Sequence, residues 1–207
     1  MKITRLKKFY RDDLPKVFKK KNLIGVELGV ARGDFSKQLI DSNKFKLLFG
    51  IDSYSLKQHN KSEYKYALKK AGIFNNYKLL NMTFDDALSL FPDNSIDFIY
   101  FDGFAHTGQD YGKTIIKWSK KIKQNGILSG DDYDDKWELN QQIINQFAID
   151  NNFDLLLTDV DKKKHIYSSW IIKVDKKIKN KDIKYSKILK YKELLKSFRL
   201  YIPNFKN

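Results

Sequence analysis

Five short apolar runs alternate with segments of helical spacing over residues 23–150, and this alternation constrains the fold more than any other feature. The apolar runs predict strands at 23–28, 46–51, 77–80, 96–101 and 126–130. The segments that follow them predict helices at 34–42, 62–72, 84–90, 109–122 and 136–150. Strands that alternate with helices indicate right-handed βαβ units and a parallel sheet. Nearly continuous apolar strands are typical of a sheet that is covered on both faces.

The pattern changes after the fifth helix. Two more apolar runs, 153–160 and 167–174, are joined by the short polar turn 161–164, with no helix between them. They predict an antiparallel hairpin at the C-terminal side of the sheet. Apolar residues then recur at helical spacing over 183–201, which predicts a basic amphipathic helix.

The first predicted strand ends in a glycine turn that runs from Glu27 through Gly29 to Gly33. Glycines suit such a turn because it needs unusual backbone angles and because a ligand can approach the main chain without meeting a Cβ. Asp52 ends the second strand, where an acid can accept hydrogen bonds from ribose hydroxyls. Ala31 stands where a G-x-G-x-x-G motif has its middle glycine, which argues against a pyrophosphate ligand. A tight turn without any ligand is the alternative interpretation.

Length and composition set further bounds. The chain has 207 residues, 42% of them hydrophobic, which is enough for one domain with its own core. It contains no cysteine, so disulfides, thiolate metal sites and cysteine nucleophiles are excluded. No apolar run approaches the roughly 18 residues of a membrane-spanning helix, and the lysine-rich residues 1–21 lack the apolar core of a secretory signal. We therefore expect a cytoplasmic protein.

The net charge of +15 is unevenly distributed. Residues 160–207 carry 15 basic and 4 acidic side chains, a balance of +11, whereas residues 1–159 carry 25 and 21, a balance of +4. A basic tail can bind nucleic acid, anionic lipid or a phosphorylated substrate. A solvated surface in a lysine-rich chain is the alternative, and the scarcity of arginine favours it, since arginine is preferred for bidentate phosphate recognition.

Taken together, these features resemble the class I S-adenosylmethionine (SAM)-dependent methyltransferases over about residues 20–175. The closest similarity is to the small metal-dependent O-methyltransferases of the macrocin and catechol type. The motifs that carry it are Phe101-Asp102-Gly103-Phe104-Ala105-His106 and Gly126-Ile127-Leu128-Ser129-Gly130-Asp131-Asp132-Tyr133. The resemblance implies a Rossmann-like, seven-stranded, mostly parallel sheet with helices on both faces and a C-terminal antiparallel hairpin.

The resemblance also implies how SAM is held. Glu27 and the backbone of the glycine turn would hold its methionine part, and Asp52 its ribose hydroxyls. Residues after the third strand would lie beside the adenine, where Met82 or Phe84 could stack on the ring; both could equally be core residues. The predicted cofactor-binding residues are Glu27, Gly29, Ala31, Gly33, Asp52, Ser53, Met82, Thr83, Phe84 and Asp102.

Three carboxylates, those of Asp102, Asp131 and Asp132, end adjacent predicted strands. They repel one another unless a positive charge lies between them, and Mg²⁺ prefers such oxygen ligands. The resemblance implies that these residues bind the metal, which would orient an acceptor hydroxyl and lower its pKa. Alternatively, Asp131 and Asp132 belong to a surface acidic run that caps the next helix.

The predicted catalytic residues are His106 and Asp102. An unperturbed histidine has a pKa of about 6.5, which suits a general base near neutral pH. His106 follows Asp102 by four residues in a loop that should overhang the pocket. The alternative is a histidine that only orders this loop.

We expect an O-methyltransferase that acts on a hydroxyl of a sugar or another small polar acceptor. RNA methylation anchored by the basic tail is one alternative, and a catalytically inactive cofactor-binding protein is another. The expected division is a methyltransferase domain over 1–175, with a basic helical segment at 1–20, and a basic helical tail over 176–207. The sequence leaves the acceptor and the oligomeric state open.

Overall fold

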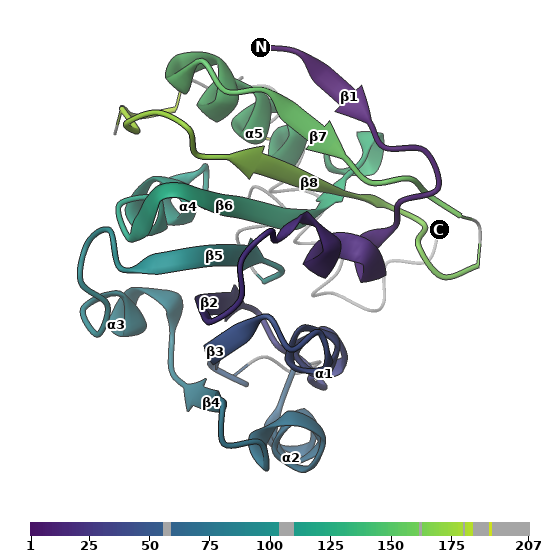
Figure 1. The fold of residues 1–207 in the computed structure, drawn as a ribbon, viewed down its shortest axis with the longest axis vertical. Helices are drawn as coiled ribbons and strands as arrows, with labels where there is room; N and C mark the ends of the chain where they lie inside the picture. The colour runs from purple at the N-terminus through teal and green to yellow at the C-terminus, as the bar shows by residue number, and fades with distance from the viewer. Residues whose placement is uncertain (56–58, 104–109, 162, 180, 184–190, 192–207) are drawn as a thin grey trace.

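The computed structural model is an α/β fold built on one eight-stranded sheet (Figure 1). It describes the chain except for residues 56–58, 104–109, 162, 180, 184–190 and 192–207. The strands are β1 (Ile3–Arg5), β2 (Leu23–Leu28), β3 (Phe45–Asp52), β4 (Tyr77–Asn81), β5 (Ile96–Phe101), β6 (Ile122–Tyr133), β7 (Leu155–Leu157) and β8 (Ser168–Lys173). Their order in the sheet is β1-β7-β8-β6-β5-β2-β3-β4. Within it, β8 runs antiparallel to β6 and β7, and the other pairings are parallel.

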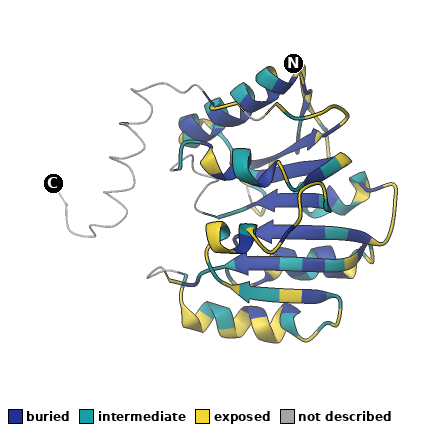
Figure 2. Cartoon of the chain, turned by 90° about the vertical axis from the view of Figure 1, so that its left-hand side faces the viewer, coloured by how far each residue is buried: buried dark blue, intermediate teal, exposed yellow. Residues whose placement is uncertain are grey.

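Helices cover both faces of this sheet. They are η1 (Arg11–Val17), α1 (Asp34–Asp41), α2 (Lys61–Ala67), η2 (Leu68–Gly72), α3 (Phe84–Leu88), α4 (Lys113–Trp118), η4 (Asp135–Trp137) and α5 (Glu138–Asn151). Side chains of η1, α1 and η2 pack in one apolar cluster, and those of α3, α4 and α5 pack in another. In Figure 2 the strands between these layers are mostly buried, whereas exposed residues gather on the outer helices and loops.

The apolar run of β5 shows why both layers are needed. Phe98 and Tyr100 belong to the cluster on the α1 face, while Ile99 and Phe101 belong to the cluster on the α5 face. All four side chains are at most 4% exposed. Successive residues of a strand point to opposite faces, so a strand buried on both sides must be apolar at nearly every position. The predicted α/β class and the predicted two-sided sheet are confirmed.

The N-terminal segment differs from the predicted basic helix over 1–20. Its residues Ile3–Arg5 form β1, an edge strand that pairs in parallel with β7. The 3-10 helix η1 follows, and its Leu14 is fully buried against the sheet. The sheet therefore has eight strands where seven were predicted, because a three-residue strand at a sheet edge leaves almost no periodicity in the sequence.

The structure also corrects the predicted end of α4 and the predicted start of β6. The helix predicted over 109–122 is shorter, since α4 ends at Trp118 and Ile122 already begins β6. The apolar positions Trp118 and Ile122 fit a helical spacing, but they belong to two different elements of the same core. The hairpin is confirmed as β7 and β8. The helix predicted over 183–201 lies almost entirely outside the described residues.

The strand order of the sheet reverses between β2 and β5, and this reversal determines where a ligand-binding site is expected. From β2 the chain adds β3 and β4 on one side, whereas β5 pairs on the other side of β2. Loops that leave the carboxyl ends of two such strands diverge, which opens a crevice where α/β proteins bind ligands. Among the described residues, no helix is both long and apolar enough to span a membrane.

Candidate active site

The glycine turn after β2 meets the end of β5 backbone to backbone. Gly29 has φ +94°, and a Cβ built on it would lie 2.1 Å from the carbonyl oxygen of Asp102. A Cβ on Gly103 would lie 2.4 Å from the Phe84 ring. Gly33, with φ +77°, begins α1 as its N-cap. Glycine is therefore required at these positions by close approach and by positive φ.

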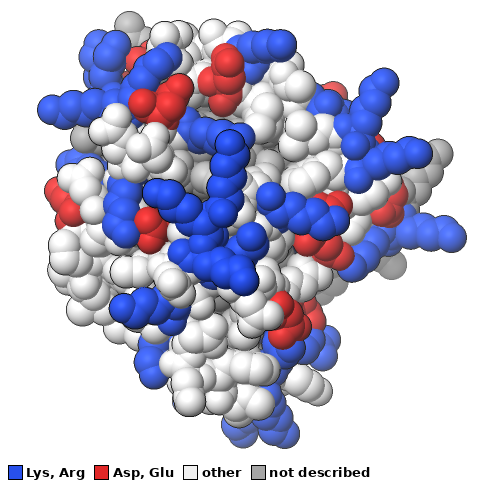
Figure 3. All heavy atoms as spheres, viewed as in Figure 1, with Lys and Arg blue, Asp and Glu red and all other residues white. Residues whose placement is uncertain are grey.

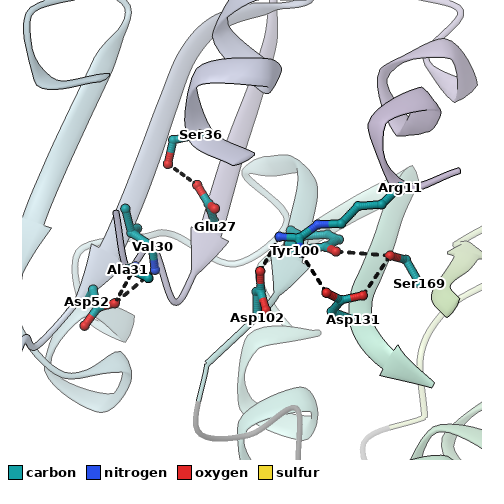
Figure 4. Close-up of polar contacts among 10 residues, drawn as sticks. All are labelled: Arg11, Glu27, Val30, Ala31, Ser36, Asp52, Tyr100, Asp102, Asp131 and Ser169. Atoms are coloured by element: carbon teal, nitrogen blue, oxygen red, sulfur yellow. Dashed lines mark hydrogen bonds and ion pairs between the residues drawn. The ribbon is translucent and has the colours of Figure 1, made fainter. Parts of the chain in front are cut away.

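Asp52 holds this turn in place. Its Oδ2 accepts hydrogen bonds from the backbone N–H groups of Val30 and Ala31, both at 3.0 Å, as Figure 4 shows. Its Oδ1 accepts another from the N–H of Tyr54 at 2.9 Å. Ala31 has φ +47°, a strained value for a residue with a Cβ, which these bonds help to maintain. A carboxylate can accept about four hydrogen bonds, so the predicted contact with a ribose remains compatible with this role.

Glu27 is buried beneath the turn, with 1% of its surface exposed. Its Oε2 accepts a hydrogen bond from the Ser36 hydroxyl, which also lies 2.9 Å from the Tyr77 hydroxyl. Burial raises the pKa of Glu27 to about 8, although the Ser36 hydrogen bond and the Arg11 charge act in the opposite direction. The side chain thus ties β2 to α1 (Figure 4).

The residues predicted to flank an adenine lie where β4 leads into α3. Thr83 caps this helix, because its hydroxyl oxygen accepts a hydrogen bond from the N–H of Asp86 at 3.1 Å. Met82 and Phe84 are half-buried and pack against the core, so each keeps part of its surface open. Ser53, the first residue after β3, shares a hydrogen bond of 2.8 Å between its hydroxyl and that of Ser55.

The predicted carboxylate cluster contains an arginine. Arg11 of η1 extends over the ends of β5 and β6, where its Nη1 donates to Asp131 Oδ2 at 2.8 Å and its Nη2 donates to Asp102 Oδ2 (Figure 4). The guanidinium also lies over the Phe35 ring, 4.5 Å from its centroid. Asp131 Oδ1 accepts from the Ser169 hydroxyl at 3.0 Å. Arg11 therefore supplies the positive charge that the carboxylates need.

Electrostatics within this cluster are strongly coupled. Burial alone would lower the pKa of Arg11, but the charge of Asp102 and further acidic groups raise it well above its usual value. Burial raises the pKa of Asp131 to about 6, which the Arg11 charge opposes and the Asp102 and Asp132 carboxylates reinforce. Burial likewise raises the pKa of Tyr100 well above its usual value, so its hydroxyl stays protonated.

The residues present do not fit the predicted three-carboxylate magnesium site. Asp102 and Asp131 face the Arg11 guanidinium. The pairing of β6 with β8 shifts register between Gly130 and Tyr133, and Asp132 within this irregularity has φ +54°. Among the described residues, no three His, Cys, Asp or Glu side chains are grouped to hold a metal ion. Magnesium binding stays a prediction without support from this geometry.

His106 lies outside the described residues, so its predicted role as general base stays a prediction. The sequence interpretation missed Arg11, Ser36 and Ser169, which complete the polar contacts of the site. Arg11 lies 91 residues from Asp102 and 120 from Asp131 in the chain, and no local pattern links such positions. The one feature of the sequence that could have drawn attention to Arg11 is the rarity of arginine, since only four of the 40 basic residues are arginines.

Comparisons with solved structures agree with this fold. SMU.1697c of Streptococcus mutans, solved in complex with SAH, is 15% identical with a TM-score of 0.58, over 78% of this chain and 94% of that one. An rRNA methylase of Streptococcus thermophilus is 14% identical with a TM-score of 0.58, over 80% and 94%. Cofactor-bound Rv0187 from MTB is 12% identical with a TM-score of 0.56, over 74% and 73%. At these identities the similarities show the fold alone.

The sheet order, the glycine turn at the switch point and the sequence similarity together define a SAM-dependent methyltransferase with the class I fold, an enzyme of the EC 2.1.1 class. The profile of the family described as "Methyltransferase domain" matches residues 26–133, which is more than half of the chain. The chain belongs to this family. Among curated proteins, none matches it.

Proposed function

We propose that this methyltransferase transfers the methyl group of SAM to a hydroxyl of a sugar or another small polar acceptor. The observation that carries the proposal is the position of Asp102. It follows β5 directly, its backbone contacts the glycine turn, and its carboxylate faces Arg11 at the carboxyl edge of the sheet. A carboxylate beside the switch-point crevice is placed to bind a hydroxyl of an acceptor that approaches the cofactor.

The residues of the crevice fit SAM. At Gly29 the turn lies against the backbone of Asp102 without a Cβ between them, and Asp52 braces the turn through the N–H groups of Val30 and Ala31. The half-buried Met82 and Phe84 would contact the adenine. The methyl group of SAM is bonded to a positively charged sulfonium sulfur, so the cofactor itself activates this group for transfer.

The protein would then need to orient the acceptor and remove one proton. As the new O–CH₃ bond forms and the S–CH₃ bond breaks, the hydroxyl proton passes to a base, for which Asp102 and His106 are the candidates. Alignment at reacting distance alone can lower such a barrier by about 7–11 kcal/mol. Because Arg11 already pairs with both Asp102 and Asp131, no step passes through Mg²⁺.

Two measurements test this function. Calorimetric titration with S-adenosylhomocysteine (SAH) should show one site, and lack of affinity for both SAM and SAH would refute the assignment. Transfer of a labelled methyl group from SAM to a panel of sugars and phenols should identify an acceptor. Asp102→Asn should then lower kcat by about 100-fold or more if the carboxylate is the base. SAH binding without turnover on any acceptor would instead indicate the inactive cofactor-binding protein.

A polyanionic acceptor such as RNA is a second candidate, and the N-terminal segment favours it. Residues 1–22 carry nine basic and two acidic side chains, a balance of +7, and the same segment brings Arg11 into the site. Figure 3 shows Lys and Arg gathered across the middle of the face drawn there. The exposed basic residues of the segment are Lys2, Arg5, Lys7, Lys8, Lys16, Lys19, Lys20 and Lys21.

Salt dependence distinguishes the two acceptors. Binding to RNA releases counterions, so its affinity should fall steeply as salt rises from 50 to 200 mM. Methylation of a neutral sugar should change little over this range. A neutral double variant, Lys19→Gln with Lys20→Gln, should weaken only the polyanionic reaction.

A further inference from the structure

Arg11 occupies the place between the carboxylates where the sequence predicts a metal ion. Its two terminal nitrogens reach Asp131 at 2.8 Å and Asp102, which are two of the three predicted ligands. A magnesium ion would need its oxygen ligands at about 2.0–2.1 Å in near-octahedral geometry, and both carboxylates would have to turn away from the guanidinium first. One cation excludes the other from this position.

The packing around Arg11 holds it there. The guanidinium lies 4.5 Å from the centroid of Phe35 and 5.3 Å from that of Tyr100. Only 25% of the side-chain surface of Arg11 is exposed, and 22% and 14% of those of Asp102 and Asp131. Removing one partner from a buried ion pair is strongly unfavourable because the remaining charge is left uncompensated.

The hydrogen bonds also fix the orientation of both carboxylates. Both oxygens of Asp131 are engaged, one by Arg11 and the other by Ser169, and the Tyr100 hydroxyl lies 3.2 Å from the Ser169 hydroxyl. Asp102 has one oxygen bound to Arg11. Within the described part of the chain, the buried Nε–H of Arg11 has no hydrogen-bond partner. Arg11 therefore orients Asp102 through its Oδ2.

We infer that Arg11 is a built-in cation that replaces a divalent metal in this site, so the enzyme needs no metal and Arg11 acts as a positioning residue for Asp102. Arginine suits this task because it is permanently charged and its planar fork matches two carboxylates at once. The inference rests on the proposed function only in assigning Asp102 to the acceptor. The exclusion of the metal follows from the contacts of Arg11.

Direct metal binding gives the first test, and it requires no acceptor. The EDTA-treated full-length protein is titrated with Mn²⁺ by electron paramagnetic resonance and with Mg²⁺ by calorimetry. We expect no site that binds either ion below millimolar concentration. A one-to-one site that is lost in Asp131→Asn would overturn the inference, whether or not SAM binds.

Variants of Arg11 give the second test. Misplacement of a reacting group by about 1 Å can lower a rate by about 100-fold, so Arg11→Met should lower kcat by about that factor while the KM for SAM changes little. Arg11→Lys, which keeps the charge but cannot bridge both carboxylates, should recover part of kcat. Lys46→Met, at the exposed amino end of β3, is the matched control and should have normal kcat.

Further measurements distinguish a loss of the role of Arg11 from misfolding and from failure of the proposed function. Thermal melting of each variant shows whether a loss of kcat reflects misfolding, and SAH titration shows whether the cofactor site survives. If Arg11→Met turns over at the normal rate, or if EDTA abolishes the activity of the original protein and Mg²⁺ restores it, the role of Arg11 is refuted. Loss of SAH binding by the unmodified chain would refute the proposed function instead.

Discussion

Glu27 offers a test of the electrostatics beneath the glycine turn, through the variant Glu27→Gln. The ordinary pKa of a glutamate is 4.5, and burial raises that of Glu27 to about 8. The folded protein therefore binds this proton more tightly than the unfolded chain does. The stabilising effect is complete below pH 4.5 and is lost as the pH rises toward 8, because the unfolded chain can then release this proton whereas the folded protein must keep it.

The magnitude follows from the pKa difference. Between these two values, each pH unit lowers the free energy of unfolding by about 1.4 kcal/mol. From pH 5 to pH 7 the loss through Glu27 amounts to about 3 kcal/mol. Glutamine keeps the shape and can still accept the hydrogen bond from Ser36, but it has no proton to lose. Glu27→Gln should thus be more stable than the original protein at pH 7 and similar to it near pH 4.5.

Urea unfolding, monitored by the fluorescence of the three tryptophans, measures this difference at half-unit steps from pH 5 to pH 8. Only the difference between the two proteins is used, since other groups titrate in the same range. Glu63→Gln, in α2, controls for the exchange itself. Parallel pH profiles for Glu27→Gln and the original protein would refute the reasoning, because Glu27 would then be ionised in the fold throughout. The resemblance to methyltransferases also predicts weaker SAM binding by Glu27→Gln.

Three further predictions concern the crevice. Gly29→Ala should lower the affinity for SAH by tenfold or more and lower the melting temperature, because its Cβ would meet the Asp102 carbonyl; unchanged SAH titration would contradict this. Asp52→Asn should cost about 1–3 kcal/mol in urea unfolding, since an amide cannot accept from all three backbone N–H groups. Thr83→Ala should cost about 1 kcal/mol through the lost α3 cap, and Thr83→Ser should retain most of that stability.

Much of the fold could be predicted because its signals are local. Apolar runs that must be buried on both faces predicted β2 to β6, and β5 matched its predicted range of 96–101. The short edge strand β1 could not be predicted, because a strand of three residues carries no usable period. The end of α4 was misplaced because Trp118 and Ile122 keep a helical spacing across the boundary.

The candidate site was likewise predicted only in part. The glycine turn was predicted from its need for unusual backbone angles, and Gly29 has φ +94°. Its contact with the backbone of Asp102 was not predicted, and the approach of a ligand to this turn stays a prediction. The proximity of Asp102 and Asp131 also followed from their places at the ends of neighbouring strands. The charge between them did not, since the argument from repulsion required a cation without specifying its source. The repulsion between two carboxylates is relieved by a nearby cation of either kind, Mg²⁺ or a guanidinium.

By itself, then, the order of amino acids determined the layered architecture and the glycine turn after β2, because hydrophobic spacing and the special backbone angles of glycine act over a few neighbouring residues. Tertiary structure alone decided that the N-terminal segment crosses the sheet and places Arg11 between two acids 91 and 120 residues away. Such a contact depends on how packed elements bring distant side chains together. That three-dimensional arrangement leaves no period in the sequence.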